Sequence, residues 1–156
     1  MSNFDLLDTV LPSDGRYCVL GLGRYPDQKF FDTREEVEAQ AKTLVDNKFD
    51  VYFGCAKYGP LNKRTADNAT YFRALWMDID CGPTKGVPND KGVIQGYLTQ
   101  QIGLDELKKF CIAARLPRPI MVSSGYGVHA YWLIEETIER RDWLPLANRL
   151  RELCVE

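Results

Sequence analysis

Residues 120–134 hold the feature that most constrains the fold: two apolar, β-rich runs separated by a glycine-containing turn. The runs 120–123 and 128–134 are joined by Ser124-Gly-Tyr-Gly127, and its glycines permit the backbone angles of a tight turn. Strands joined this closely pair antiparallel, because a parallel connection needs a crossover of about a dozen residues or more. The chain therefore contains an antiparallel sheet element.

Strand and helix patterns alternate along the rest of the chain. Thr33-Arg-Glu-Glu36 is a capping-box pattern, and the apolar spacing after it predicts a helix over residues 33–48. Two further helices are expected, at residues 104–114 and 143–153, and four further strands, at 17–22, 28–31, 51–56 and 75–80. Polar residues, Gly and Pro predict loops at 57–70 and 82–96. This alternation predicts an α+β (or α/β) fold.

Composition narrows the classes of function. The 156 residues fit one domain, no run of about 18 apolar residues predicts a membrane span, and the N-terminus has no signal-peptide pattern, so an intracellular protein is expected. The net charge of −2 argues against binding nucleic acid by bulk charge alone. Five cysteines without a C-x-x-C pair argue against a disulfide scaffold or a zinc site. With one histidine, any metal must be held mostly by carboxylates.

Two aspartates stand out in Trp76-Met-Asp78-Ile-Asp80. Alternation along a strand puts Asp78 and Asp80 on one face, roughly 6.5–7 Å apart by the rise per residue. Aspartate is disfavoured in strands, so the pair needs compensation, and a Mg²⁺ ion bound by both carboxylates would supply it. The alternative is a strand that ends near Asp78, with Asp80 opening the following turn as a solvated residue.

The turn at 124–127 leads into a strand that carries His129. Glycines there can turn amide groups towards an anion, and the Ser124 hydroxyl and the His129 ring add donors for phosphate oxygens. A nucleophile-activating role for His129 would need an orienting acid and a nearby nucleophile, which the spacing does not supply. The alternative is a structural, hydrogen-bonded histidine beside a plain hairpin turn.

Together the two motifs resemble the archaeo-eukaryotic primase superfamily, in particular its phage and plasmid primase-polymerase branch. The matching segments are LWMDIDCG, PIMVSSGYGVHAYW and the LPRP that ends the spacer helix, with weaker support from YFGCAKYG. The resemblance covers residues 15–154 and implies one domain. Within it, an N-terminal αβ unit would span about residues 1–57, and a catalytic unit with an RRM-like sheet and flanking helices would span about 58–156.

The resemblance also implies a function. Asp78 and Asp80 would bind Mg²⁺ or Mn²⁺ and be catalytic together with His129. Ser124 and His129 would contact the phosphates of an NTP or dNTP, and Lys85 and Arg64 are weaker nucleotide-binding candidates. The implied reaction is nucleotidyl transfer on a single-stranded DNA template, in a cytoplasm (the host's, if the protein is viral), with a replicative helicase as a further partner and no membrane.

One expected element of the superfamily has no match. Its third motif, a further acidic metal ligand on a strand after the last helix, should follow Leu153, but the chain ends at Glu156. Glu135 and Glu136 follow the second motif directly and do not match it. The resemblance therefore predicts a domain incomplete at its C-terminus, and it leaves open whether this polypeptide is an enzyme.

Two other functions stay open. One is a catalytically inactive nucleotide-binding or single-stranded nucleic-acid-binding module of the same fold. The other is a metal-dependent nuclease or phosphohydrolase that uses Asp78 and Asp80, although the lone histidine argues against it.

Overall fold

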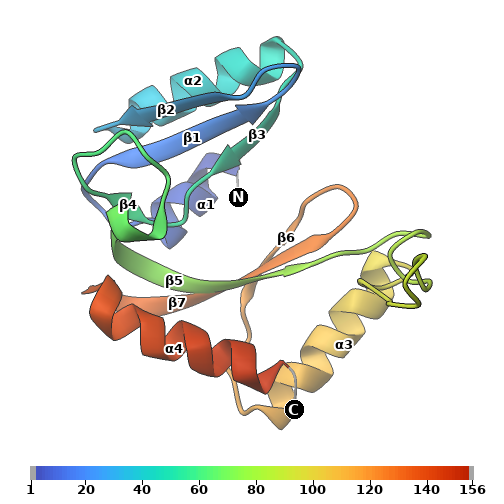
Figure 1. The fold of residues 1–156 in the computed structure, drawn as a ribbon. Coiled ribbons are helices and arrows are strands. Elements are labelled where there is room, and N and C mark those ends of the chain that lie inside the picture. The colour runs from blue at the N-terminus through green and yellow to red at the C-terminus, as the bar shows by residue number, and fades with distance from the viewer. Residues whose placement is uncertain (1–2, 155–156) are drawn as a thin grey trace. The chain divides into compact units, whose positions relative to one another are not determined.

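The computed structural model describes residues 3–154 as helices, strands and connecting loops (Figure 1). The helices are α1 (Asn3–Val10), α2 (Arg34–Asp46), α3 (Gln100–Ala113) and α4 (Arg140–Leu153), with a 3-10 turn at Ala66–Asn68. The strands are β1 (Tyr17–Leu22), β2 (Asp27–Phe31), β3 (Asp50–Phe53), β4 (Lys57–Tyr58), β5 (Ala69–Ile79), β6 (Ile120–Ser123) and β7 (Val128–Glu139). The predicted α+β class is confirmed. None of the helices in this range is both long and apolar enough to cross a bilayer.

The chain divides into two compact units. The N-terminal unit comprises residues 1–74 with 134–145, and the C-terminal unit comprises 75–133 with 146–156. Strands β5 and β7 each contribute to both units. The sequence prediction placed a single boundary near residue 57 within one domain, and that boundary stays a prediction about how the domain is organised.

The N-terminal unit contains a three-stranded antiparallel sheet in the order β2-β1-β3. Strand β1 is buried along nearly its whole length, because α2 packs on the sheet and β1 is the central strand. Gly21 allows this close packing, since a Cβ there would lie 2.6 Å from a methyl carbon of Leu44 on α2. The predicted capping box is present at the start of α2, where Thr33 accepts from the Glu36 amide.

The second sheet has the order β4-β5-β7-β6. The predicted loop 57–70 is wrong in part: β4 and the 3-10 turn lie within it, and β5 begins at Ala69 rather than near residue 75. The polar segment is ordered because the buried Asn68 amide donates to the carbonyls of Leu61 and Lys63 at 2.7 and 2.9 Å. Helix α1 was not predicted.

The core of the C-terminal unit lies between one face of its strands and two helices. Ile79 of β5 and Val128, Ala130 and Trp132 of β7 are buried there with side chains of α3 and α4. The Trp132 indole N–H donates to the Pro117 carbonyl at 2.9 Å. Because neighbouring residues of a strand face opposite ways, the residues between these core positions belong to the other face of the sheet.

Candidate active site on the open sheet face

Asp78 and His129 lie on the face of the C-terminal sheet that points away from the helices. Asp78 is flanked by Met77 and Ile79, which pack in the core, and His129 is flanked by the buried Val128 and Ala130. Alternation along each strand therefore gives the carboxylate and the imidazole the same face. A shared site for Asp78 and His129 requires this arrangement.

The two side chains approach each other although 51 positions separate them in the sequence. His129 Nε2 lies 3.4 Å from Asp78 Oδ1, and the Asp78 carboxylate is 67% exposed while the imidazole is 35% exposed. His129 Nδ1 lies 3.5 Å from the hydroxyl of Tyr131, a buried residue two positions along β7. The imidazole is thus held between a carboxylate and a phenol. The Asp78 carboxylate is exposed, so a ligand could compete with it for His129, whereas Tyr131 is buried.

Asp80 occupies the first position after β5, which ends at Ile79. The prediction of a strand through residue 80 is therefore wrong by one residue, and Asp80 opens the turn at Gly82, where φ is +136°. The Asp80 carboxylate is about half exposed and pairs with Lys85, whose Nζ lies 2.9 Å from Asp80 Oδ2. The side chain is therefore not a fully solvated turn residue, because it has a cationic partner.

The loop that carries Lys85 is held to the end of β5 by its backbone. The amide of Tyr97 donates to the Asp80 carbonyl at 2.9 Å, and the amide of Gly82 donates to the Tyr97 carbonyl at 2.8 Å. The Lys85 carbonyl accepts from the amides of Gln95 and Gly96 at 3.1 and 3.0 Å. The predicted loop 82–96 thus has a defined path, and it returns Lys85 to the carboxylate.

The turn at 124–127 lies against the backbone that joins the two aspartates. A Cβ added to Gly127 would lie 2.7 Å from the Ile79 carbonyl oxygen and 3.1 Å from the Ser124 Oγ. Only glycine fits this approach, and it places the Ser124 hydroxyl near the residue between Asp78 and Asp80. The turn is closed by the Ser124 amide, which donates to the Gly127 carbonyl at 3.0 Å, and Gly125 has a φ of +90°.

Arg64 belongs to the N-terminal unit. Burial raises the pKa of the Tyr58 phenol to about 12, and the nearby Arg64 guanidinium partly opposes that rise. The assignment of Arg64 to nucleotide phosphates stays a prediction.

The donor set suits a hard divalent cation. Asp78 and Asp80 offer exposed oxygen ligands. His129 Nε2 lies 3.4 Å from the Asp78 carboxylate, and the Lys85 ammonium lies 2.9 Å from the Asp80 carboxylate. Mg²⁺ commonly uses one or two protein carboxylates and completes its shell with water and substrate phosphates. Within residues 3–154, no group of three or more His, Cys, Asp or Glu side chains could enclose an ion. The two aspartates would thus hold an ion that shares its shell with a ligand.

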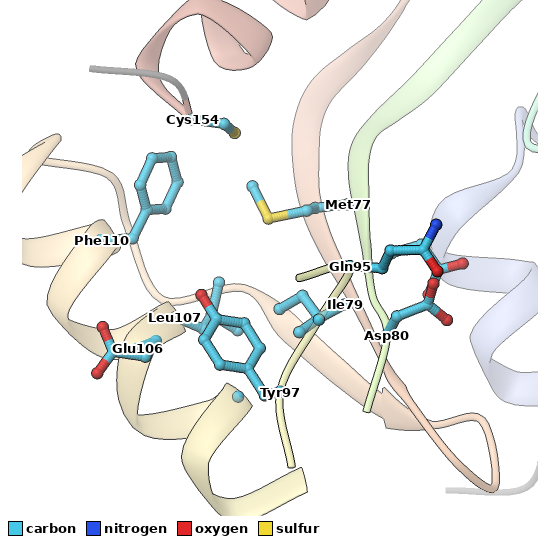
Figure 2. Close-up of a pocket in the computed structure, with 12 residues that line it drawn as sticks. Met77, Ile79, Asp80, Gln95, Tyr97, Glu106, Leu107, Phe110 and Cys154 are labelled. Atoms are coloured by element: carbon cyan, nitrogen blue, oxygen red, sulfur yellow. The ribbon is translucent and has the colours of Figure 1, made fainter. Parts of the chain in front are cut away.

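A hollow of about 220 Å³ lies between β5 and α3 (Figure 2). Its wall is mainly apolar, with Met77, Leu107 and Phe110, and Tyr97 and Glu106 add polar groups. Figure 2 shows Asp80 on the other side of β5 from Leu107 and Phe110. The hollow is therefore mainly a gap in the packing of the helical face, and Asp78 and Asp80 contribute to its lining where it reaches β5.

One side chain at the site was not found from the sequence. Gln100, the first residue of α3, donates from its carboxamide to the turn that carries Ser124. Nothing in the sequence near Gln100 marks it, because its partners are more than 20 residues away. Tyr131 and Trp132 are both buried, so these aromatics serve packing.

A comparison with known proteins shows a solved structure with a similar fold. No protein-family model matches the chain, and no curated protein matches it. Among solved structures, the archaeo-eukaryotic primase domain of the cyanophage S-2L primase-polymerase is similar, with a TM-score of 0.56, 16% sequence identity and 89% of this chain covered. The match spans 64% of that structure's chain. The chain therefore has a fold of the archaeo-eukaryotic primase kind.

Proposed function

We propose that this chain is a nucleotidyltransferase domain of the primase-polymerase kind. It would extend a nucleic-acid strand on a single-stranded DNA template, using NTPs or dNTPs with Mg²⁺ or Mn²⁺. The observation that carries the proposal is the approach of His129 to Asp78, with the Ser124 turn against the backbone between the two aspartates, within a fold shared with a primase-polymerase domain.

Each side chain has a distinct role in this proposal. Asp78 and Asp80 would hold the divalent ion, which when bound lowers the pKa of the attacking 3′-hydroxyl and stabilises the charge that develops on the phosphates. His129 would exchange Asp78 for a phosphate oxygen and donate from Nε2. The Ser124 hydroxyl would donate to another phosphate oxygen. Positioning and charge stabilisation thus account for the chemistry, with no covalent step on the protein.

Lys85 has a place in the same scheme. Its ammonium lies 2.9 Å from the Asp80 carboxylate, so Lys85 would have to leave that carboxylate for Asp80 to hold an ion. The released ammonium would be close to the phosphates that share the ion's shell. Lys85 would thus neutralise Asp80 without the ion and contact a phosphate with it.

The direct test is strand synthesis on single-stranded DNA with NTPs or dNTPs and Mn²⁺. Asp78→Asn is expected to lower the rate at least about 100-fold, because it removes a charged ligand. The matched control is Asp105→Asn on the exposed surface of α3, whose carboxylate contacts Gln101 and Lys108 and which should keep full activity. Equal rates for the two variants would refute the role of Asp78.

A binding module without catalysis is the second candidate. Within residues 3–154 no group of three or more His, Cys, Asp or Glu side chains is arranged to hold a metal ion, and this favours it. Binding of NTP that is weakened by His129→Ala, with no synthesis under any metal, would establish this function. Degradation of the template without nucleotides would instead indicate a nuclease.

A further inference from the structure

The carboxamide of Gln100 joins helix α3 to the turn between β6 and β7. Its Nε2 lies 2.8 Å from the Gly125 carbonyl oxygen, 2.9 Å from the Gly127 carbonyl oxygen and 3.1 Å from the Ser123 Oγ. One amide group thus reaches three acceptors that span the whole turn. The contact is long-range, because 25 residues separate Gln100 from Gly125.

The start of α3 leaves this side chain available. Thr99 is the N-cap, and its hydroxyl accepts from the backbone amide of Ile102 at 3.2 Å. This amide at the helix start therefore does not need the Gln100 side chain as an acceptor. Gln100 is partly buried, whereas its neighbour Gln101 is exposed and contacts Asp105 on its own helix. The two adjacent glutamines therefore differ in their contacts: Gln100 binds the turn, and Gln101 contacts a residue of its own helix.

The turn needs such a contact to keep one conformation. Two of its four residues are glycine, Gly125 has a φ of +90°, and the Tyr126 side chain at its tip is 86% exposed. Glycine-rich turns lose much conformational entropy when they are ordered. Because a trans peptide points its N–H opposite to its C=O, holding the Gly125 carbonyl on Gln100 also directs the Tyr126 N–H away from Gln100.

We propose that Gln100 is a positioning residue for the phosphates of the incoming nucleotide. Its carboxamide holds the turn 123–127 in the conformation that keeps the Ser124 hydroxyl beside the backbone between Asp78 and Asp80. The inference rests on the proposed function, because the ligand is the nucleotide that the aspartates and His129 would bind. A donor group held in place before binding lowers the ordering cost of binding.

Two variants with a matched control test this role. Gln100→Glu keeps the length of the side chain but replaces the donating NH₂ with an oxygen that faces two carbonyl oxygens, and Gln100→Ala removes the group. Both are expected to raise the Kd for ATP or dATP with Mn²⁺ about tenfold. If the wild-type chain synthesises strands, KM for the nucleotide should rise by a similar factor while kcat changes less than about threefold. Gln101→Glu is the control and should leave these constants within twofold.

Hydrogen exchange gives a readout that does not depend on function. The Ser124 amide, which donates to Gly127, should exchange faster in both Gln100 variants than in Gln101→Glu, with the remaining amides of β6 and β7 unchanged. If the wild-type chain binds nucleotide and Gln100→Glu binds it equally well, the positioning role is refuted while the proposed function stands. If the wild-type chain binds no nucleotide, the proposed function is refuted, and the role of Gln100 towards phosphates fails with it.

Discussion

Strands β1 and β7 differ in which of their faces are buried. Strand β1 of the N-terminal unit is buried at five successive positions, so both of its faces serve packing. Strand β7 packs Val128, Ala130 and Trp132 in the core with one face, and on its other face His129 is partly exposed although Tyr131 is buried. A strand buried on both faces has no position for a ligand-binding side chain, whereas an alternating strand supports the fold with one face and presents polar groups on the other.

The largest expected effect tests the alternation in β7. Trp132→Ala removes a buried indole and its hydrogen bond to Pro117, and it should lower the free energy of unfolding by about 3–5 kcal/mol. The neighbouring Leu133→Ala, at an exposed position, should cost less than about 0.5 kcal/mol. Urea unfolding of both variants measures the difference. Similar losses for both would show that β7 does not divide into a core face and an open face.

The same experiment on β1 should give a different pattern. Val19→Ala and Leu20→Ala remove adjacent side chains that face opposite ways, and both positions are buried. We expect each to cost about 1.5–3 kcal/mol, from the loss of buried methyl and methylene groups. A loss at only one of them in urea unfolding would show that β1 has an open face after all.

Glycine substitutions should distinguish the turn from an open loop. Gly127→Ala would place a Cβ 2.7 Å from the Ile79 carbonyl, so the turn must shift, at a cost of about 1–3 kcal/mol. Gly92→Ala introduces strain from a φ of +74° but meets no atom within 4 Å. Nucleotide affinity should therefore fall for Gly127→Ala and stay unchanged for Gly92→Ala. Titration of both variants with ATP and Mn²⁺ checks this, and equal affinities would argue against a role for the turn.

Alkaline pH should destabilise the N-terminal unit through groups that are buried in their neutral form. Burial raises the pKa of Cys18 to about 11 and that of Cys55 to about 12, from an ordinary value of 9.0. Unfolding would release protons from these thiols above pH 9, so the stability present below pH 9 decreases as the pH rises from 9 towards 11. The free energy of unfolding at pH 8 and 10.5 measures the effect, and Cys55→Ala should reduce its slope. A flat profile would contradict it.

The smallest effect concerns Lys85. Lys85→Met removes the cation beside Asp80, so Mn²⁺ without nucleotide should bind a few-fold more tightly, because no ammonium competes for the carboxylate. Stability should change by less than about 1 kcal/mol, as for other exposed ion pairs. Lys108→Met, which breaks an exposed pair on α3, is the control. Mn²⁺ titration followed by electron paramagnetic resonance gives both affinities, and weaker binding in Lys85→Met would contradict the competition.

Local sequence patterns were sufficient to predict several strands and helices. Strand β1 was predicted with its observed bounds because its apolar run is continuous, and the start of α2 was predicted because Thr33 and Glu36 form a capping box within four residues. The first two residues of β5 were assigned to a loop together with Asn68, since the buried role of Asn68 depends on carbonyls five to seven residues away. A polar residue that is buried by such contacts has the same local signature as a loop residue.

The site was predictable only in part. Strand alternation predicted one face for the two aspartates, but the approach of His129 to Asp78 followed from the family resemblance, since no local pattern relates positions 51 residues apart. Gln100 could not be found because a glutamine at a helix start is ordinary in any sequence. The roles of Ser124, Lys85 and Arg64 towards a nucleotide remain predictions.

The approach of Gly127 to Ile79 has a consequence for genetics. The contact joins one main chain to another, so exchanging the isoleucine for a smaller amino acid would not relieve a clash at Gly127. Revertants selected from a Gly127→Ala parent should therefore carry insertions, deletions or substitutions within residues 123–127, or a reversal to glycine. Compensating replacements at position 79 should be rare among them.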